Sequence, residues 1–445
     1  FFVFFSNISR PPLLVSPSKE LQQAATNTNV ATITNRTEVS EEKEKEQVPT
    51  TWGGNTLTQE EKELKGEPVT VFTLQGGAWL QHKTTHLSSA KIQIIGQDAI
   101  LGSLRGGVRV HDPKNRISLY ARNAEYDKFA ETIVLDGRPR LYYLDKEKRR
   151  TKITAKNIKR YMAQSKVILN GRVIIENKDY TILSDAAVFW EKEKTLVMED
   201  YPFVFGQNSY LTGEKVTYNS EKNKNVLEKE TSFFRYSYEK KKQKEAEVEP
   251  VEKQKILSIF AGDKLVYQGG EGKNSQIGMY GTARMFRPDA EFSADFVKAY
   301  GEKKQDVLAK KSVRFFDKEN NMIIWGEHLQ HRKLDLYTHV TDNAKIEFLK
   351  KGTQEVSATL YAVEIERFGE RKEIVARGNV SIVTESVTAY GEYATFSETD
   401  KKIVLEGNPR LKRKDKILYC GRIVLYPEQN KAFITDGMRV QNEKQ

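Results

Sequence analysis

Hydrophobic and polar residues alternate along most of this chain, in short runs separated by polar turns. In residues 394–411, two apolar residues alternate with polar ones, a charged turn follows, and two further apolar residues precede a corner at Gly407. Since successive side chains of a strand point to opposite faces, this pattern predicts two strands, the second bent at the glycine. Residues 124–141 and 187–204 reuse the layout with the same spacing of 13 residues from alanine to corner. The chain is therefore predicted to be a repeat protein.

The corner, followed at the second and usually the fourth position by an apolar residue, recurs about every 30 residues. Successive gaps are 30, 30, 34, 29, 31, 50, 30, 31, 36, 29 and 30 residues. Most corners are glycine, as expected where the backbone turns sharply or adopts a positive φ. The predicted corners are Gly77, Gly107, Gly137, Gly171, Asp200, Thr231, Gly281, Lys311, Asp342, Gly378, Gly407 and Gly437.

Each repeat holds two strands of roughly ten residues, and helical periodicity is nearly absent. The prediction is an all-β fold of tandem antiparallel hairpins, arranged as two facing sheets in an elongated array. An open array of this kind leaves a free edge at each end, which can accept a strand from another chain.

Composition divides the chain into four parts. Residues 1–68 are rich in polar residues and predict a disordered tether, whose apolar start at residues 1–5 is either the end of a truncated signal or anchor, or an arbitrary beginning. Thr58 and Glu61 form a capping-box pattern, which predicts a short helix over residues 58–65. Residues 240–255 are a charged run and predict a linker between two repeat halves, residues 69–239 and 256–445.

Charge and cysteine usage leave several classes of partner open. The net charge is +11 and the pI is about 9.2, which suits nucleic acid, an acidic membrane surface or an anionic small molecule, but equally a lysine-rich β surface. Lysine and arginine are interspersed with glutamate rather than striped, which argues against nucleic acid. With Cys420 the single cysteine, no disulfide forms within the chain.

No candidate catalytic or metal site has the residue spacing that its chemistry requires. His328 and His331 fall on opposite faces of a strand, which is poor for a shared metal. The run at residues 269–273 lacks the spacing of a phosphate-binding loop, and no base accompanies Cys420. We therefore predict no catalytic residue, metal or cofactor.

Residues 387–440 resemble the OstA-like (LptA) β-jellyroll repeats of lipopolysaccharide-transport periplasmic proteins. The resemblance rests on Ala394-x-Phe396, on Ile403-Val-Leu-x-Gly-Asn-Pro409, and on the Gly-Asn-Val strand start at residues 378–380. It is good over residues 360–440, recognisable over 100–220 and faint over 230–350. This chain is about twice the length of a simple bridge protein, so it is expected to join two bridge modules, or an LptC-like module and a bridge module.

The resemblance implies an open groove whose apolar face shields acyl chains, in domains that stack end to end and have no catalytic residues. Residues at the matching positions of the repeat pattern are candidates for lining this groove. The alternative is that they form the ordinary packed core of a β-sandwich. These candidates are the aromatic residues Tyr126, Phe189, Tyr218 and Phe396, and the aliphatic residues Ile133, Leu135, Val197, Ile403 and Leu405.

The predicted function is that of a periplasmic, non-enzymatic bridge component that carries lipopolysaccharide or a related amphiphile between inner and outer membranes. Its partners would be the lipid, and copies of itself or other OstA-like domains of the membrane complexes, paired at strand edges. A structural or adhesive β-array that binds proteins or glycans is the alternative.

Overall fold

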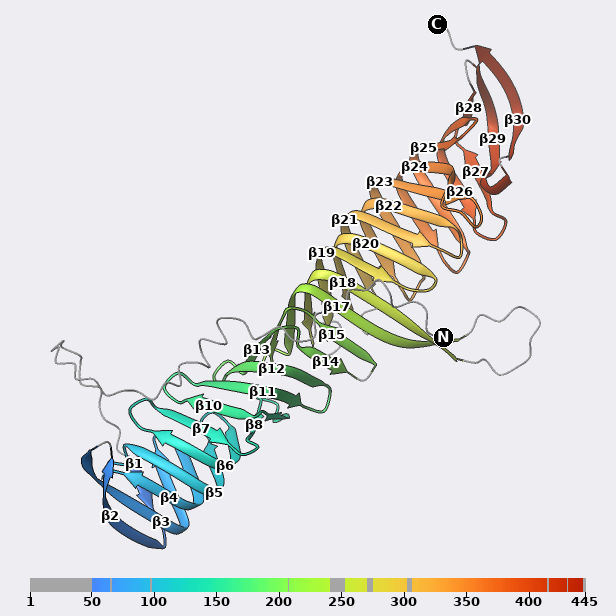
Figure 1. The fold of residues 1–445 in the computed structure, drawn as a ribbon. Coiled ribbons are helices and arrows are strands. Elements are labelled where there is room, and N and C mark those ends of the chain that lie inside the picture. Colours follow the sequence, from blue (N-terminus) through green and yellow to red (C-terminus); the bar gives the residue numbers. More distant parts are fainter. Residues whose placement is uncertain are drawn as a thin grey trace, which may run out of the picture. The chain divides into compact units, whose positions relative to one another are not determined.

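The described part of the chain is all β-structure with every strand pairing antiparallel. The structure, a computed structural model, describes residues 50–64, 66–96, 98–206, 208–240, 253–269, 275–301, 306–413, 416–429 and 431–442. These residues form thirty strands and one short 3₁₀ helix, Pro427–Gln429 (Figure 1). The described residues contain no helix that is long and apolar enough to cross a membrane. The all-β prediction is confirmed.

The chain divides into two compact units, residues 1–225 and 226–445. Strands beginning in the first unit are β1 Thr50–Gly53, β2 Thr56–Leu64, β3 Glu67–His82, β4 Thr85–Ile95, β5 Leu101–Asp112, β6 Ile117–Asp127, β7 Thr132–Asp136, β8 Arg140–Leu144, β9 Arg150–Thr154, β10 Asn157–Tyr161, β11 Lys166–Glu176, β12 Thr181–Trp190, β13 Thr195–Glu199, β14 Phe203–Gly206, β15 Ser209–Thr212, β16 Lys215–Asn219 and β17 Lys224–Lys240. The remaining strands are β18 Lys253–Gln268, β19 Gln276–Phe286, β20 Ala290–Tyr300, β21 Asp306–Asp317, β22 Met322–Arg332, β23 Tyr337–Leu349, β24 Val356–Phe368, β25 Glu373–Thr384, β26 Thr388–Ser397, β27 Lys402–Glu406, β28 Arg410–Arg413, β29 Lys416–Tyr426 and β30 Lys431–Asn442.

The predicted corners are two-residue steps at which the backbone turns. In β5 the pairing with β6 shifts between Arg105 and Val108, and the residues between them, Gly106 and Gly107, both have positive φ. Twelve such consecutive pairs occur in the described residues, and eleven of the twelve predicted corners belong to one. The prediction at Thr231 is wrong by one residue, because the positive-φ pair is Lys229–Glu230.

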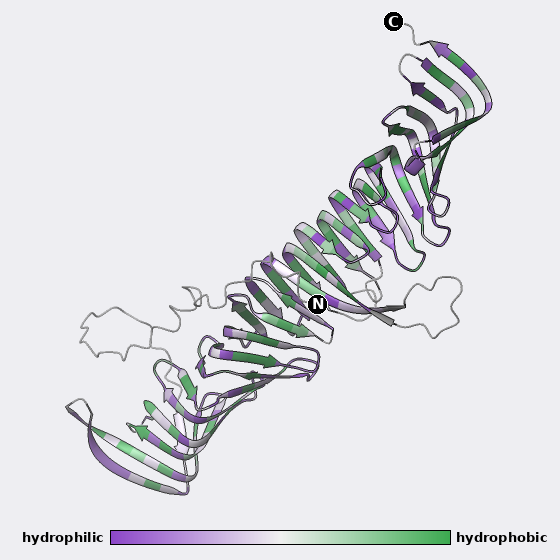
Figure 2. Cartoon of the chain, turned by 45° about the vertical axis from the view of Figure 1, so that its right-hand side comes forward, coloured by the Kyte–Doolittle hydropathy of each residue, from purple (hydrophilic) through white to green (hydrophobic). Residues whose placement is uncertain are grey.

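Each corner folds the strand over, so that its two halves lie in two facing layers (Figure 1). In the first unit, layer A is the layer that contains the part of β5 before its corner, and layer B is the layer that contains the part after it. In the second unit, the parts of β21 before and after its corner define layers A and B in the same way. Leu104 and Val108 flank the corner and are both buried. The step therefore keeps the apolar side inward on both layers, and Figure 2 shows the alternation of hydrophilic and hydrophobic residues along the strands.

The array begins before the predicted boundary at residue 69. β1 and β2 both pair with β3, in register Trp52 opposite Leu80 and Leu57 opposite Leu74. The predicted helix over residues 58–65 is wrong, because pairing with β3 overrides the local capping signal. Most of the predicted linker, residues 241–252, and of the predicted tether, residues 1–49, lies outside the described residues, so both stay predictions.

Candidate functional site: an apolar interior closed by two arginine clusters

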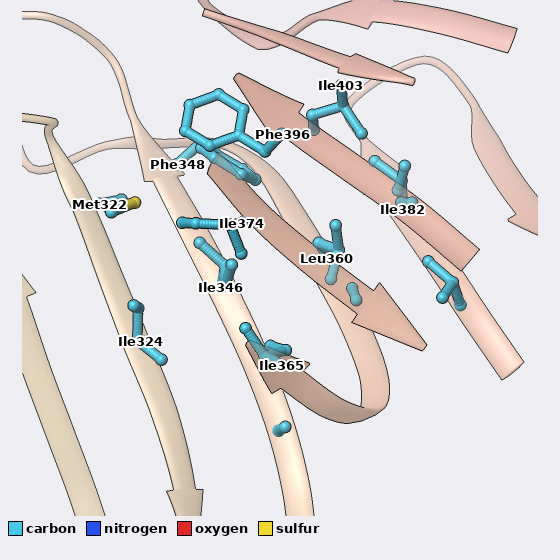
Figure 3. Close-up of a cluster of buried hydrophobic side chains, with 14 of the residues drawn as sticks. Met322, Ile324, Ile346, Phe348, Leu360, Ile365, Ile374, Ile382, Phe396 and Ile403 are labelled. Atoms are coloured by element: carbon cyan, nitrogen blue, oxygen red, sulfur yellow. The ribbon is translucent and has the colours of Figure 1, made fainter. Parts of the chain in front are cut away.

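The space between the two layers of each unit is filled by apolar side chains. Eight of the nine candidate groove residues lie there, and none of the eight is more than 4 % exposed. Burial raises the pKa of the Tyr126 hydroxyl to about 12, in keeping with an apolar surrounding. The interior is packed in this structure, and Figure 3 shows that part of it between Phe348 and Ile403.

Val197 is the candidate that the structure contradicts. It lies on the outward-facing parity of β13, whereas its neighbours Leu196 and Met198 are fully buried. The corner pair here is Asp200 and the residue after it. Inner residues precede a corner pair by four and two positions, as Ile133 and Leu135 precede Gly137 in the sequence, and that count leads to Leu196 and Met198.

One aromatic residue from each layer meets its counterpart across the interior of each unit. Tyr143 of β8 stacks on Phe189 of β12 with ring centroids 4.7 Å apart, and Phe348 of β23 contacts Phe396 of β26 at 4.8 Å (Figure 3). Sequence reasoning found the layer A member of each pair and missed the layer B member.

A buried ion cluster, here named the first latch, joins the two layers at their open margin in the first unit. Arg160 at the end of β10 in layer A donates to both carboxylate oxygens of Glu191, at 2.6 and 3.0 Å. The same guanidinium contacts Asp112 and donates to the Thr85 hydroxyl at 3.2 Å, and both partners lie in layer B. The side chains of Arg160, Asp112 and Glu191 are at most 2 % exposed. The latch therefore closes the margin of the apolar interior.

The turns on both sides reinforce the first latch. Asp112 accepts hydrogen bonds from the backbone and side-chain amides of Asn115 at 3.2 and 2.8 Å, which holds the turn after β5. The ammonium of Lys194, in the layer A turn that begins at Glu191, donates to the Asn115 carbonyl. The layers are thus joined by two cations from layer A.

Ionisation of the first latch is favoured although the groups are buried. Burial opposes the charged form of Asp112, but hydrogen bonds from Arg160 and Asn115 outweigh it and lower the pKa of the carboxyl. Burial likewise opposes the charge on Arg160, while Glu191 and Asp112 raise its pKa. Burial lowers the pKa of Lys194. The arginine is therefore the cation on which the latch depends.

The second unit holds a second latch built from the corresponding residues. Arg367 of β24 donates to Glu398 at 2.6 Å in layer A and to Asp317 at 2.8 Å in layer B. Asn320 donates to Asp317 at 3.0 Å through both its backbone and its side chain, and Lys401 donates to Asn320 at 2.7 Å. The Arg367 side chain is 20 % exposed, so this latch is more open to solvent.

The two latches are related by a regular offset in the chain. Asp317, Arg367 and Glu398 follow Asp112, Arg160 and Glu191 by 205 to 207 residues. The recurring pattern, Asp-x-x-Asn, then Arg, then Glu-x-x-Lys, is the signal that sequence reasoning missed, because each charge by itself resembles an exposed turn residue. A small hollow beside the second latch is lined by Asn320, Lys401 and Glu428 and reaches Phe348 and Phe396.

The edge strands differ in what they turn toward the interior. In β2, Gln59 and Glu61 lie opposite Phe72 and Thr70, while Leu57 on the same face lies opposite Leu74 and is exposed, so that end is covered largely by polar side chains. In β30, Met438 and Val440 lie opposite Cys420 and Leu418, which pack against the core, and they are 64 % and 52 % exposed. Among the described residues, no group of three or more His, Cys, Asp or Glu side chains is placed to hold a metal ion.

Together these features define a class of protein: a bent-strand, two-layer antiparallel β array with a latched apolar interior. The chain matches no family model and no curated protein. Among solved structures it is similar to LptH, the LptA-homologous periplasmic component of the lipopolysaccharide transport device of Pseudomonas aeruginosa. The two share 16 % identity over 25 % of this chain and 79 % of that chain, with a TM-score of 0.23, a likeness too low to carry an argument about function.

Proposed function

We propose that this protein is a non-enzymatic periplasmic carrier of lipopolysaccharide or a related amphiphile, which holds acyl chains between the two layers of each unit. The observation that carries the proposal is the latched interior, which occurs twice, each time built from corresponding residues. A closed core needs no buried charges at its margin, because apolar residues of similar volume would avoid the desolvation cost that buried ion pairs carry. A margin held by one arginine and one lysine, rather than by a backbone ladder, can part and close again.

The hollow beside the second latch supplies the entrance in this proposal. It is bordered by polar turn residues and leads to Phe396, but it is too small for an acyl chain in this structure. The acyl chain therefore enters only when the second latch opens, and then meets apolar side chains while its headgroup stays among polar ones. The exposed apolar residues of β30 favour pairing with a further copy or another OstA-like domain, as the bridging role requires.

Photo-crosslinking tests the proposal. A benzophenone amino acid in place of Phe396 is expected to form an adduct with lipopolysaccharide. The matched control is the same probe at Tyr393, which lies in the same strand but is 41 % exposed on the outer face. Arg367→Met, which opens the second latch, is expected to raise the yield at 396 and leave that at 393 unchanged.

The tight packing of the interior favours a second candidate, a structural or adhesive β array. Ile403 and Leu405 are fully buried, as in a permanent core. Equal yields at 396 and 393, unaffected by opening the latch, would support the array and contradict the carrier.

A further inference from the structure

The outer face of layer B in the first unit carries a row of cations and aromatic rings. Cross-strand register places Arg109 opposite Tyr120, and Tyr120 opposite Arg140. In the next row, Tyr142 lies opposite Lys152. These side chains point away from the apolar interior, on the other side of the strands that bury Leu119 and Leu141.

The aromatic rings are held in place by their neighbours. The Arg150 guanidinium lies 4.0 Å from the centre of the Tyr142 ring, and Tyr120 meets Tyr142 edge-on at 5.7 Å. A shallow hollow is formed here by Arg140, Tyr142, Arg150, Lys152 and Glu176. We name this surface the tyrosine–arginine patch.

The tyrosine–arginine patch carries an excess of positive charge. Arg109, Arg140, Arg150 and Lys152 provide four cations, and Glu176 is the carboxylate among them, bound to Lys152 at 2.7 Å. An anion that enters the hollow therefore meets guanidinium groups, which bind phosphate through paired hydrogen bonds.

The second unit contains the same row with less net charge. Arg314, Trp325 and Lys345 lie opposite one another in the same way. Glu347 stands where the first unit has Tyr142, and it accepts from Lys345 at 2.7 Å and from the Trp325 indole at 2.8 Å. The second unit thus supplies a matched surface with a smaller excess of positive charge.

We propose that the tyrosine–arginine patch binds a phosphorylated saccharide. The arginines recognise the phosphate, and the exposed Tyr120 ring presents a flat apolar face with a polar hydroxyl tip, which suits the mixed C–H and hydroxyl surface of a sugar ring. Tyr142 holds both Tyr120 and Arg150 in place. A membrane surface fits less well, because Tyr142 is half-buried and covered by Arg150 rather than protruding. The site lies outside the interior, so it does not depend on lipid carriage.

Affinity electrophoresis of the full chain through gels that contain phosphorylated dextran, unmodified dextran or inorganic polyphosphate tests the proposal. Phosphorylated dextran is expected to retard the protein most. Arg140→Gln with Arg150→Gln should weaken that retardation at least about tenfold, since each change removes hydrogen bonds to a charged group. Tyr142→Leu, which keeps the apolar packing, should weaken it about threefold or more.

The matched control is Arg314→Gln with Lys345→Gln in the second unit, which removes the same formal charge and should leave retardation unchanged. Thermal melts confirm that each variant folds. Equal retardation by polyphosphate with no effect of Tyr142→Leu would reduce the patch to a general anion surface and overturn the proposal. The absence of retardation, or binding to anionic phosphatidylglycerol vesicles in preference to the glycan, would overturn it as well.

Discussion

At the scale of single residues, a corner brings two positions of neighbouring strands so close together that one of them must lack a side chain. Gly407 has a φ of +78°, and a Cβ there would lie 2.5 Å from the Cβ of Glu392 in the neighbouring strand. At the corner of β30 the arrangement is reversed: Asp436 takes positive φ, and the facing residue is Gly421, whose added Cβ would lie 2.6 Å from that of Asp436. One glycine per facing pair therefore satisfies the close approach.

Gly407→Ala is expected to destabilise the second unit by about 2–4 kcal/mol, the sum of positive-φ strain and a steric clash. Chemical denaturation measures the loss. Gly352→Ala is the matched control, because Gly352 has the same φ of +78° but open space around its missing Cβ. Glu392→Gly added to Gly407→Ala should recover the clash component, and a double variant as unstable as the single one would contradict this account.

Arg160→Met is expected to cost about 3–5 kcal/mol, because it leaves two buried carboxylates without their cation. Thermal unfolding measures the loss. Adding Asp112→Leu and Glu191→Leu should restore most of the stability, since an apolar cluster needs no counter-ion. If Arg160→Met unfolds at the same temperature as the parent, the first latch does not hold the layers together.

Errors of prediction at this scale have specific physical causes. The alternation of apolar residues correctly predicted that Ile403 and Leu405 face inward. It misplaced Val197, because Val197 and Leu196 are both aliphatic and the preceding turn does not fix which of the two faces inward. The latch carboxylates looked like solvated turn residues, and only contact with an arginine from distant β10 gives Asp112 its role.

At the scale of strands and turns, the latches link elements that no ladder connects. The turn after β5 and the end of β10 belong to opposite layers, and Arg160 joins them through Asp112. Its pair with Glu191 lies within layer A. The backbone ladders hold each layer, while side-chain charges hold one layer to the other at the margin. The margin is therefore the part of the fold most sensitive to protonation.

Acid is expected to weaken the first latch. The pKa of Asp112 in the folded protein lies below its ordinary value of 3.8, so its stabilising contribution is present above that value and is lost as the pH falls through the folded pKa. Thermal melts between about pH 5 and pH 2 should show a falling midpoint. Asp112→Asn should lower the midpoint at pH 5 and flatten its pH dependence; an unchanged slope would assign the acid sensitivity to other groups.

At the scale of the whole molecule, the two units share one arrangement of charged and aromatic residues. The latches and the aromatic pairs of the two units recur at offsets of 205 to 207 residues. Regular spacing made the repeats predictable, since a period near 30 residues is visible in the corners alone. The sequence led to the expectation of two joined modules through the length of the chain, but the charged residues that relate the two units were missed because they are few and lie far apart in the sequence.

Separate latches should act independently. The losses of stability from Arg160→Met and Arg367→Met are expected to add to within about 0.5 kcal/mol in the double variant, because the residues share no partner. Arg367→Met should cost less, since its latch is more exposed. A deviation well beyond that limit in denaturation experiments would show that the units are coupled.

The latches have a consequence for folding in a chain of hairpins that share a common spacing. Apolar repeats with a common spacing pair almost as well when displaced by one repeat, so hydrophobic burial alone discriminates weakly between the native register and shifted ones. Arg160 and Arg367 are each matched by carboxylates at one register within their own unit. A displaced pairing would bury an arginine without its counter-ions, at a cost of several kcal/mol, so these few charges select the correct alignment of the two layers as the chain folds.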